Sequence, residues 1–196
     1  MELIAVCYYT DERYRAESDR LAASCERFGV PLTCYQMPDL GSWAKNCTHK
    51  PDVILRAMHE SPADIIYLDA DAELARPIPP IEFGAAAYPQ WHDTFPCLGT
   101  ILVRNSALGR EFIQDWKASL DAPASSIFPD HRQKHFAGTE LPGFCQIMAK
   151  WGKSVTVIPL TWYAPDKLIN QKDAIILQHQ ASRRFRKLRS RGKLTA

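Results

Sequence analysis

The amino-acid sequence predicts one α/β domain with a doubly wound, mostly parallel or mixed sheet and helices on both faces. Strand-like apolar runs alternate with helix-length amphipathic segments through the first half, as in chains that build parallel sheets. The 196 residues suit one ordinary domain, and a hydrophobic content of 46% excludes a disordered chain. No internal repeat or clear linker interrupts the pattern. We therefore expect a domain over residues 1–182 and a basic tail over residues 183–196.

The first half of the chain carries the clearest alternation. Thr10 and Asp11 are residue types that begin helices, and Gly29 is a typical helix end. Pro51 suits the first turn of a second helix, which reaches about Glu60. The expected strands of this half cover residues 2–9, 30–36 and 64–68.

The second half is less regular but still contains core elements. Apolar residues recur every fourth position from Leu108 to Leu120, which predicts a helix over residues 107–120. Residues 121–142 are rich in Pro, Ser, Asp and His and are expected to form a loop, followed by a short helix over residues 143–151. The remaining expected strands cover residues 83–88, 99–104, 154–160 and 174–178.

Residues 65–73, Ile-Ile-Tyr-Leu-Asp-Ala-Asp-Ala-Glu, are the most informative segment. If the chain stays extended, Asp69 and Asp71 point the same way at the end of a buried strand. Their oxygens suit a hard divalent cation, Mn²⁺ or Mg²⁺, which can hold a diphosphate. Ligands of doubly wound sheets bind beyond such strand ends. The alternative is an ordinary polar strand end or turn.

This pattern resembles the GT-A glycosyltransferases, which bind a nucleotide-sugar at an Asp-x-Asp motif. The resemblance is one of pattern, and it spans most of the chain. It includes a Trp/Asn/Lys loop with Lys50-Pro51, the strand Gly-Thr-Ile-Leu-Val-Arg-Asn over residues 99–105, and a late strand, Ile-Ile-Leu-Gln-His, over residues 175–179.

The resemblance implies a GT-A-like fold, a cation site and a nucleotide-sugar donor, linked to UDP by the habit of the family. It assigns the cation to Asp69, Asp71 and His179, although His179 could equally be an ordinary core or surface histidine. Cationic side chains can stabilise the diphosphate leaving group, and the candidates are Lys50, Arg183 and Arg184. Each of these three could instead be a solvated surface charge.

The loop after the first strand is where the family holds the base and ribose. The resemblance therefore makes Tyr8, Tyr9, Thr10 and Arg13 candidates for donor binding. One of the two tyrosines is expected to lie in the core, because side chains alternate along a strand.

The acceptor side is less defined. An inverting transferase needs a carboxylate base, for which Glu140, Asp93 and Asp130 are candidates, whereas a retaining enzyme needs none. Glu140 and Gln146 depart from the Asp-Gln pair common in the family. Segment 88–98 offers aromatic rings for stacking or as plugs of the core. The acceptor hydroxyl could belong to a glycan, a small molecule or a modified base in DNA.

Composition limits the setting. Six cysteines form no Cys-x-x-Cys pair, so we expect reduced thiols and no zinc site. The N-terminus resembles a strand and no apolar run approaches the length of a membrane span, so we expect a cytoplasmic protein without a membrane span. Seven of the 24 basic residues lie in the tail, which leaves 17 against 22 acidic residues in the rest of the chain.

Three other functions compete with glycosyl transfer. A phosphatase of the haloacid dehalogenase type would carry Asp-x-Asp on its first strand, and a nucleotidyltransferase would carry a glycine-rich loop after that strand. Residues 8–15 contain no glycine, and the motif follows two βα units. A non-catalytic protein that binds nucleic acid through the basic tail, on a transferase-like fold, is the alternative from a different class.

Overall fold

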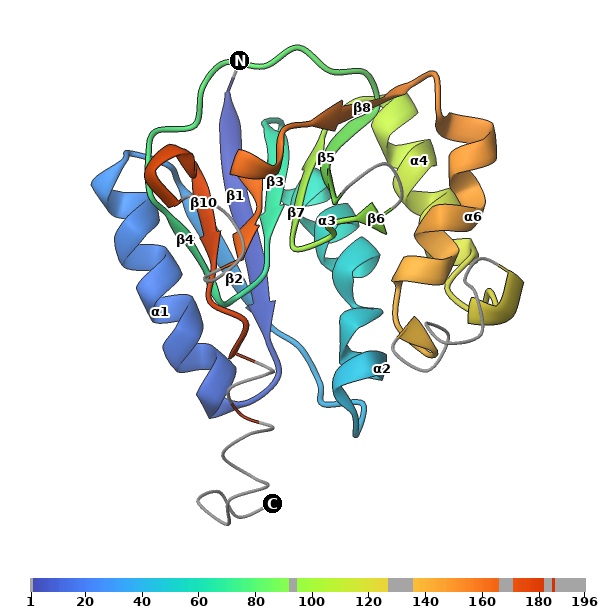
Figure 1. Ribbon diagram of the computed structural model, residues 1–196, viewed down its shortest axis with the longest axis horizontal. Helices are drawn as coiled ribbons and strands as arrows, with labels where there is room; N and C mark the ends of the chain where they lie inside the picture. The colour runs from blue at the N-terminus through green and yellow to red at the C-terminus, as the bar shows by residue number, and fades with distance from the viewer. Residues whose placement is uncertain (1, 92–94, 127–135, 166–170, 182–184, 186–196) are drawn as a thin grey trace.

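A mixed seven-stranded sheet forms the centre of the molecule, in the order β2-β1-β3-β7-β5-β6, with β8 paired to β5 (Figure 1). The computed structural model describes residues 2–91, 95–126, 136–165, 171–181 and 185. The strands of this sheet are β1 (Leu3–Tyr9), β2 (Leu32–Gln36), β3 (Asp64–Leu68), β5 (Ala86–Trp91), β6 (Phe95–Pro96), β7 (Thr100–Val103) and β8 (Val155–Ile158).

The first three strands form the parallel unit that the alternation predicts. β1 lies between β2 and β3 and runs parallel to both, with Val6 opposite Thr33 on one side and Tyr67 on the other. β7 then joins β3 in the antiparallel sense, and β5 pairs with β7 antiparallel and with β8 parallel. The predicted mixed α/β sheet is therefore confirmed.

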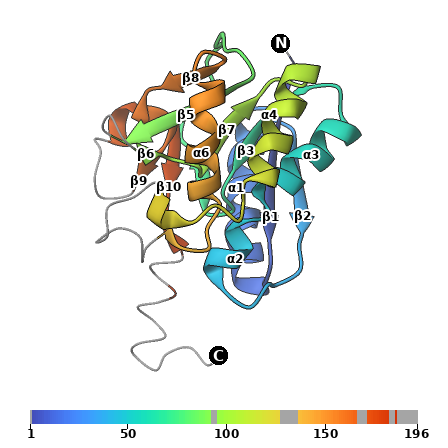
Figure 2. The ribbon, with the colours of Figure 1, turned by 90° about the vertical axis from the view of Figure 1, so that its right-hand side faces the viewer.

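Helices cover both faces of the sheet, as predicted. Helix α1 (Glu12–Arg27) packs on one face, and its N-terminus is capped by the Asp11 side chain, which accepts hydrogen bonds from two backbone N–H groups. The other face carries α3 (Lys50–Glu60), α4 (Ala107–Ala118) and α6 (Leu141–Trp151), which Figure 2 shows in front of the sheet. Every residue of β3 is buried between these two layers.

A small second sheet lies apart from the central one. It consists of β4 (Ala72–Leu74), β10 (Ile176–Gln178) and β9 (Ala164–Pro165), in the order β4-β10-β9. The expected strand 174–178 thus forms, but it pairs antiparallel with β4 and does not join the central sheet. Because β4 directly follows the Asp-x-Asp turn, this pairing brings the end of the described chain to that turn.

Several boundaries differ from the prediction. α6 begins at Leu141, two residues earlier than expected, so that Glu140 occupies its N-cap position. A short helix α2 (Trp43–Cys47), capped by Ser42, lies in the segment expected to be a loop. β5 begins at Ala86 and not at residue 83. Gly84, just before it, lies where an added Cβ would come within 2.4 Å of the Ser154 carbonyl oxygen.

The remaining described elements are short 3₁₀ turns over Ala124–Ser126, Leu160–Trp162 and Gln171–Asp173. Within the described part of the chain, every helix is too short or too polar to cross a membrane.

Candidate functional site

The Asp-x-Asp motif lies in a turn and not in an extended strand. β3 ends at Leu68, and the Ala72 N–H donates to the Asp69 carbonyl oxygen at 2.9 Å, closing the turn before β4. The expectation that both carboxylates project as alternate residues of one strand was therefore wrong in its geometry. The turn still keeps the two close enough for the charge of Asp69 to affect the Asp71 carboxyl.

Lys50 is the centre of a charged cluster beside this turn. The charged members of this Lys50 cluster are Lys50, Asp69 and Glu140. Its ammonium lies 3.0 Å from Asp69 Oδ1 and 2.7 Å from Glu140 Oε1, and it donates to the Leu98 carbonyl oxygen at 3.1 Å. The Lys50 side chain is 5% exposed and that of Glu140 is 6% exposed. The alternative that Lys50 is a solvated surface charge is therefore wrong.

The pKa of Lys50 follows from two opposing effects. Burial by itself would lower it, but the carboxylates of Asp69 and Glu140 outweigh burial and hold the pKa above its ordinary value. The lysine is therefore charged at neutral pH. One buried cation thus faces two carboxylates that come from the end of β3 and the start of α6.

Tyr67 completes the support of Asp69. Its hydroxyl donates to Asp69 Oδ1 at 2.9 Å, and its ring lies 5.5 Å from the Lys50 ammonium. Burial, and then the Asp69 charge, raise the pKa of Tyr67, so the phenol stays protonated as a donor. Oδ2 of Asp69 lies toward Gly99, where an added Cβ would come within 2.7 Å of it. Gly99 thus leaves space beside the carboxylate.

Asp71 is buried and electrostatically strained. Its Oδ2 accepts a hydrogen bond from the Ala181 N–H, and its carbonyl oxygen accepts one from the His179 N–H. Burial and the neighbouring charge of Asp69 nevertheless raise the pKa of the Asp71 carboxyl to about 6. The buried Asp71 and the partly exposed Asp69 are two hard oxygen donors that repel each other, and a divalent cation would offset both charges.

His179 lies close to this turn through its backbone, while its ring nitrogen Nε2 is 2.8 Å from Glu73 Oε2. Within the described residues, no three His, Cys, Asp or Glu side chains gather into a ready metal site. Mg²⁺ commonly uses one or two carboxylates together with waters and substrate phosphates, so the pair Asp69 and Asp71 fits such an ion. The role of His179 as a third ligand stays a prediction.

Tyr8 and Tyr9 are the last two residues of β1, and Tyr8 lies beside the cluster. The Tyr8 hydroxyl donates to the Asn46 carbonyl oxygen at 2.7 Å, and its ring packs against His49 and Tyr67. Tyr8 and Tyr9 are both half-buried, and Tyr8 packs against the core beside the cluster.

Thr10 and Arg13 occupy the start of the α1 segment. Thr10 Oγ1 accepts a hydrogen bond from the Asn46 side chain at 3.3 Å. Arg13 pairs with Asp11 at 2.8 Å and lies 5.7 Å from the ring of Phe185. Their roles in holding a base or ribose stay predictions. Asp93, Asp130, Arg183 and Arg184 lie outside the described residues.

Sequence inspection missed two members of the cluster. Tyr67 could have been found, because it stands two residues before Asp69 and side chains two apart share a face near a strand end. Cys47, from α2, is buried beside Glu140, and burial followed by the Glu140 charge raises the pKa of its thiol. Nothing in the local sequence of Cys47 indicates this contact.

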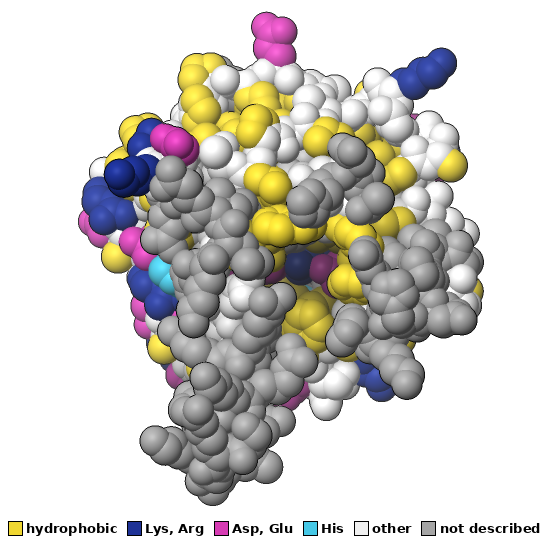
Figure 3. Space-filling view, viewed as in Figure 1, with side chains coloured by type: hydrophobic (Ala, Val, Ile, Leu, Met, Phe, Trp, Pro, Cys, Tyr) yellow, Lys and Arg dark blue, Asp and Glu magenta, His cyan; other side chains and the backbone are white. Residues whose placement is uncertain are grey.

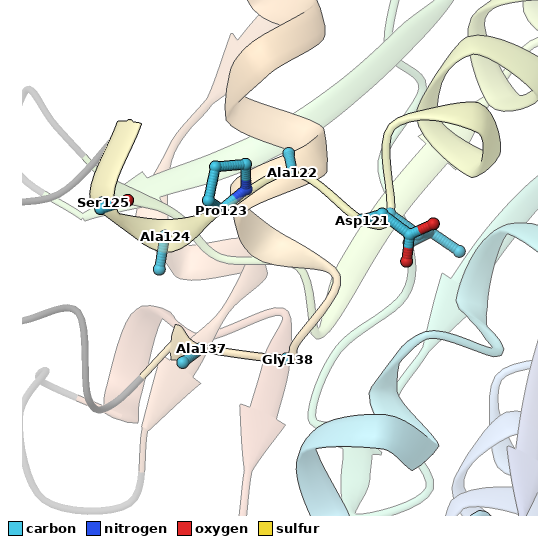
Figure 4. A pocket seen from close by; sticks show the side chains of 8 residues that line it. Asp121, Ala122, Pro123, Ala124, Ser125, Ala137 and Gly138 are labelled. Atoms are coloured by element: carbon cyan, nitrogen blue, oxygen red, sulfur yellow. The ribbon is translucent and has the colours of Figure 1, made fainter.

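The surface around the site is hollowed. Figure 3 shows a depression with a basic and an acidic side chain at its floor and hydrophobic side chains around it. A separate, shallow depression of about 460 Å³ lies between the end of α4 and the residues before α6 (Figure 4). Its lining is mostly small and apolar, with Asp121 as its ionisable residue.

Comparison with known proteins shows a structural likeness without a sequence likeness. Neither a family model nor a curated protein sequence matches the chain. A solved structure that matches is the crystal structure of a glycosyltransferase involved in the glycosylation of the major capsid of PBCV-1. The match has a TM-score of 0.69 and 14% sequence identity, and covers 95% of this chain and 98% of that one. The chain therefore has the fold of that glycosyltransferase.

Replacing Lys50 by methionine tests the cluster. We expect Lys50→Met to destabilise the protein by about 3–5 kcal/mol, since it leaves buried carboxylates without their cation. The double variant Lys50→Met/Glu140→Gln should recover part of this loss. Lys117, half-exposed and paired with Asp52, provides the control, and Lys117→Met should cost less than about 1 kcal/mol. Equal, small losses in urea unfolding for both lysines would contradict a central role of Lys50.

The raised pKa of Asp71 predicts an unusual pH dependence in metal-free buffer. The folded pKa of about 6 exceeds the unfolded value of about 3.9, so wild-type stability falls as the pH rises from 4 through 6. Asp71→Asn removes this penalty. The variant should exceed wild type by up to about 3 kcal/mol at pH 8, with no difference near pH 4. Denaturant titrations across this range, with the surface variant Asp52→Asn as control, check the sign. A variant weaker than wild type at pH 8 would refute it.

Proposed function

We propose that this protein is a metal-dependent glycosyltransferase that moves a sugar from a nucleoside-diphosphate sugar to an acceptor hydroxyl. One observation carries the proposal: at the carboxyl end of β3, the buried ammonium of Lys50 pairs with the carboxylates of Asp69 and Glu140. Ligands bind at this edge in doubly wound sheets. The likeness to a capsid-modifying glycosyltransferase over 95% of the chain supports the same interpretation.

The reaction sets the requirements of the site. The acceptor oxygen bonds to the anomeric carbon of the sugar, the bond from that carbon to the diphosphate breaks, and the nucleoside diphosphate leaves with the bonding electrons. The acceptor proton passes to a base or to solvent. Negative charge therefore grows on the diphosphate, and the site must stabilise it.

Asp69 and Asp71 would hold Mn²⁺ or Mg²⁺, with His179 as the candidate third ligand. When bound, such an ion acts as a Lewis acid on the phosphate oxygens. The residues of the chain then have separate tasks. Tyr67 and Lys50 hold Asp69 Oδ1 from the protein side, which leaves Oδ2 beside Gly99 directed away from them. Asp71 is held by the backbone of Ala181.

Lys50 contributes a permanent positive charge next to the diphosphate position. The Lys50 ammonium pairs with both Asp69 and Glu140. A change in the charge of either carboxylate therefore changes the strength of the electrostatic attraction on the ammonium. Glu140 lies at the N-terminus of α6, where the helix dipole favours a negative charge. It is the described carboxylate best placed to act as the acceptor base. Uridine as the donor nucleoside follows from the GT-A resemblance.

Donor binding is tested by thermal unfolding with nucleotides and nucleotide-sugars, each with and without Mn²⁺. We expect one UDP-sugar with Mn²⁺ to stabilise the protein by roughly 2.7 kcal/mol at a hundredfold excess over Kd, or about 5 °C or more in Tm. Asp71→Asn should lose this shift, while Asp52→Asn keeps it. A protein that shows no shift with any nucleotide but binds DNA would support the nucleic-acid-binding alternative.

The role of Glu140 is tested by turnover. If it accepts the acceptor proton, Glu140→Gln should lower kcat by about 10²-fold or more. The Kd for the donor should change much less, because glutamine keeps the shape of the side chain. A sugar product of inverted configuration at the anomeric carbon is expected together with this loss. Unchanged kcat, or a product of retained configuration, would exclude Glu140 as the base.

A further inference from the structure

Two cysteines outside the charged cluster stand directly opposite each other in the central sheet. Cys7 of β1 and Cys34 of β2 are register partners in parallel strands, and their sulfur atoms are 3.0 Å apart. Neighbouring strands lie about 4.8 Å apart, within the range of Cα separations that disulfides span. Both side chains therefore project on the same face with their sulfurs in contact.

The two thiols differ in accessibility. Cys7 is fully buried in the core beneath α1, among residues such as Leu21 and Leu68. Cys34 is exposed, because β2 stands first in the strand order and β1 is its neighbour in the described sheet. A reagent in solution can therefore reach the exposed Cys34, whereas the buried Cys7 is shielded from it.

The two thiols also differ in acidity. Hydrogen bonds from Cys7 and then from Ser18 of α1 outweigh partial burial and lower the pKa of Cys34 to about 7. The partner effect raises the pKa of Cys7, which burial raises further. Burial also raises the pKa of Cys25 and Cys145, to about 11 in each case. Cys34 is thus the thiol with most thiolate at neutral pH, and the thiolate is the reactive form.

We propose that Cys7 and Cys34 form a reversible dithiol–disulfide site whose co-substrates are hydroperoxides. The Cys34 thiolate attacks the terminal peroxide oxygen and the O–O bond breaks. A sulfenic acid forms, and the leaving group is hydroxide from hydrogen peroxide or an alkoxide from an alkyl hydroperoxide. The Cys7 sulfur then attacks the Cys34 sulfur, its proton leaves with the displaced hydroxyl as water, and the S–S bond forms. Two thiols are oxidised, and one hydroperoxide is reduced to water or an alcohol. Reduction by an external thiol reverses the change.

Tryptic mapping tests this site without ambiguity. Cleavage isolates Cys7 in residues 1–13 and Cys34 in residues 28–45, and neither peptide contains another cysteine. Folded wild-type protein is treated with one equivalent of hydrogen peroxide, alkylated and digested without reductant. We expect a peptide that links 1–13 to 28–45, lacks two hydrogens relative to the sum of the two, and disappears after dithiothreitol.

Three variants complete the design. Cys34→Ser, at an exposed position, should abolish the linked peptide, and Cys145→Ser should retain it. Cys7→Ser should leave Cys34 to accumulate as sulfenic or sulfinic acid, and if this core variant does not fold, the other two decide. In unoxidised wild type, iodoacetamide should alkylate Cys34 at least about tenfold faster than Cys25.

The proposal is overturned if wild-type Cys34 is oxidised or capped without linkage to Cys7. It is equally overturned if no cysteine reacts, or if the linked peptide fails to form in oxidised Cys145→Ser.

Discussion

The buried ammonium of Lys50 is the interaction on which the arrangement of the site depends. It joins the first turn of α3, the end of β3 through Asp69, and the start of α6 through Glu140. A buried lysine is costly unless it is paired and hydrogen-bonded, and here two carboxylates and the Leu98 carbonyl oxygen supply that pairing. Elements that are far apart in sequence are thereby held in one geometry around a single charge.

The turn after β3 places Asp71 next to this cluster. A straight continuation of β3 would have carried Asp71 onward in the sheet, but the turn directs the chain into β4 and keeps Asp71 near Asp69. β10 then pairs with β4, and the segment after it contributes the Ala181 N–H to Asp71. Among the described residues no ion pair joins a cation to Asp71, while burial and the charge of Asp69 raise its pKa. In the proposed function, a divalent ion would supply the positive charge that these two carboxylates lack.

The structural likeness to a known glycosyltransferase concerns the fold and not the individual groups of the site. The two sequences are 14% identical, yet the two folds match over nearly their full lengths. A fold can persist through such change because a core requires apolar volume and pattern more than particular residues. Function depends instead on particular groups, which is why the proposed transfer of sugar rests on the Lys50 cluster.

Local sequence determined the elements, and the tertiary structure decided their partners. Apolar periodicity and capping residues such as Asp11 marked α1, α3, α4 and seven of the strands to within a few residues, because these signals are local. The short strands β4, β6 and β9 were not predicted. The carboxylates of Asp69 and Asp71 were recognisable for the same reason. By contrast, the burial of Lys50 depends on Glu140, ninety positions later in the chain, and no local pattern encodes that meeting. The contact between Cys7 and Cys34 likewise exists only through strand register, which is set when β1 and β2 pair.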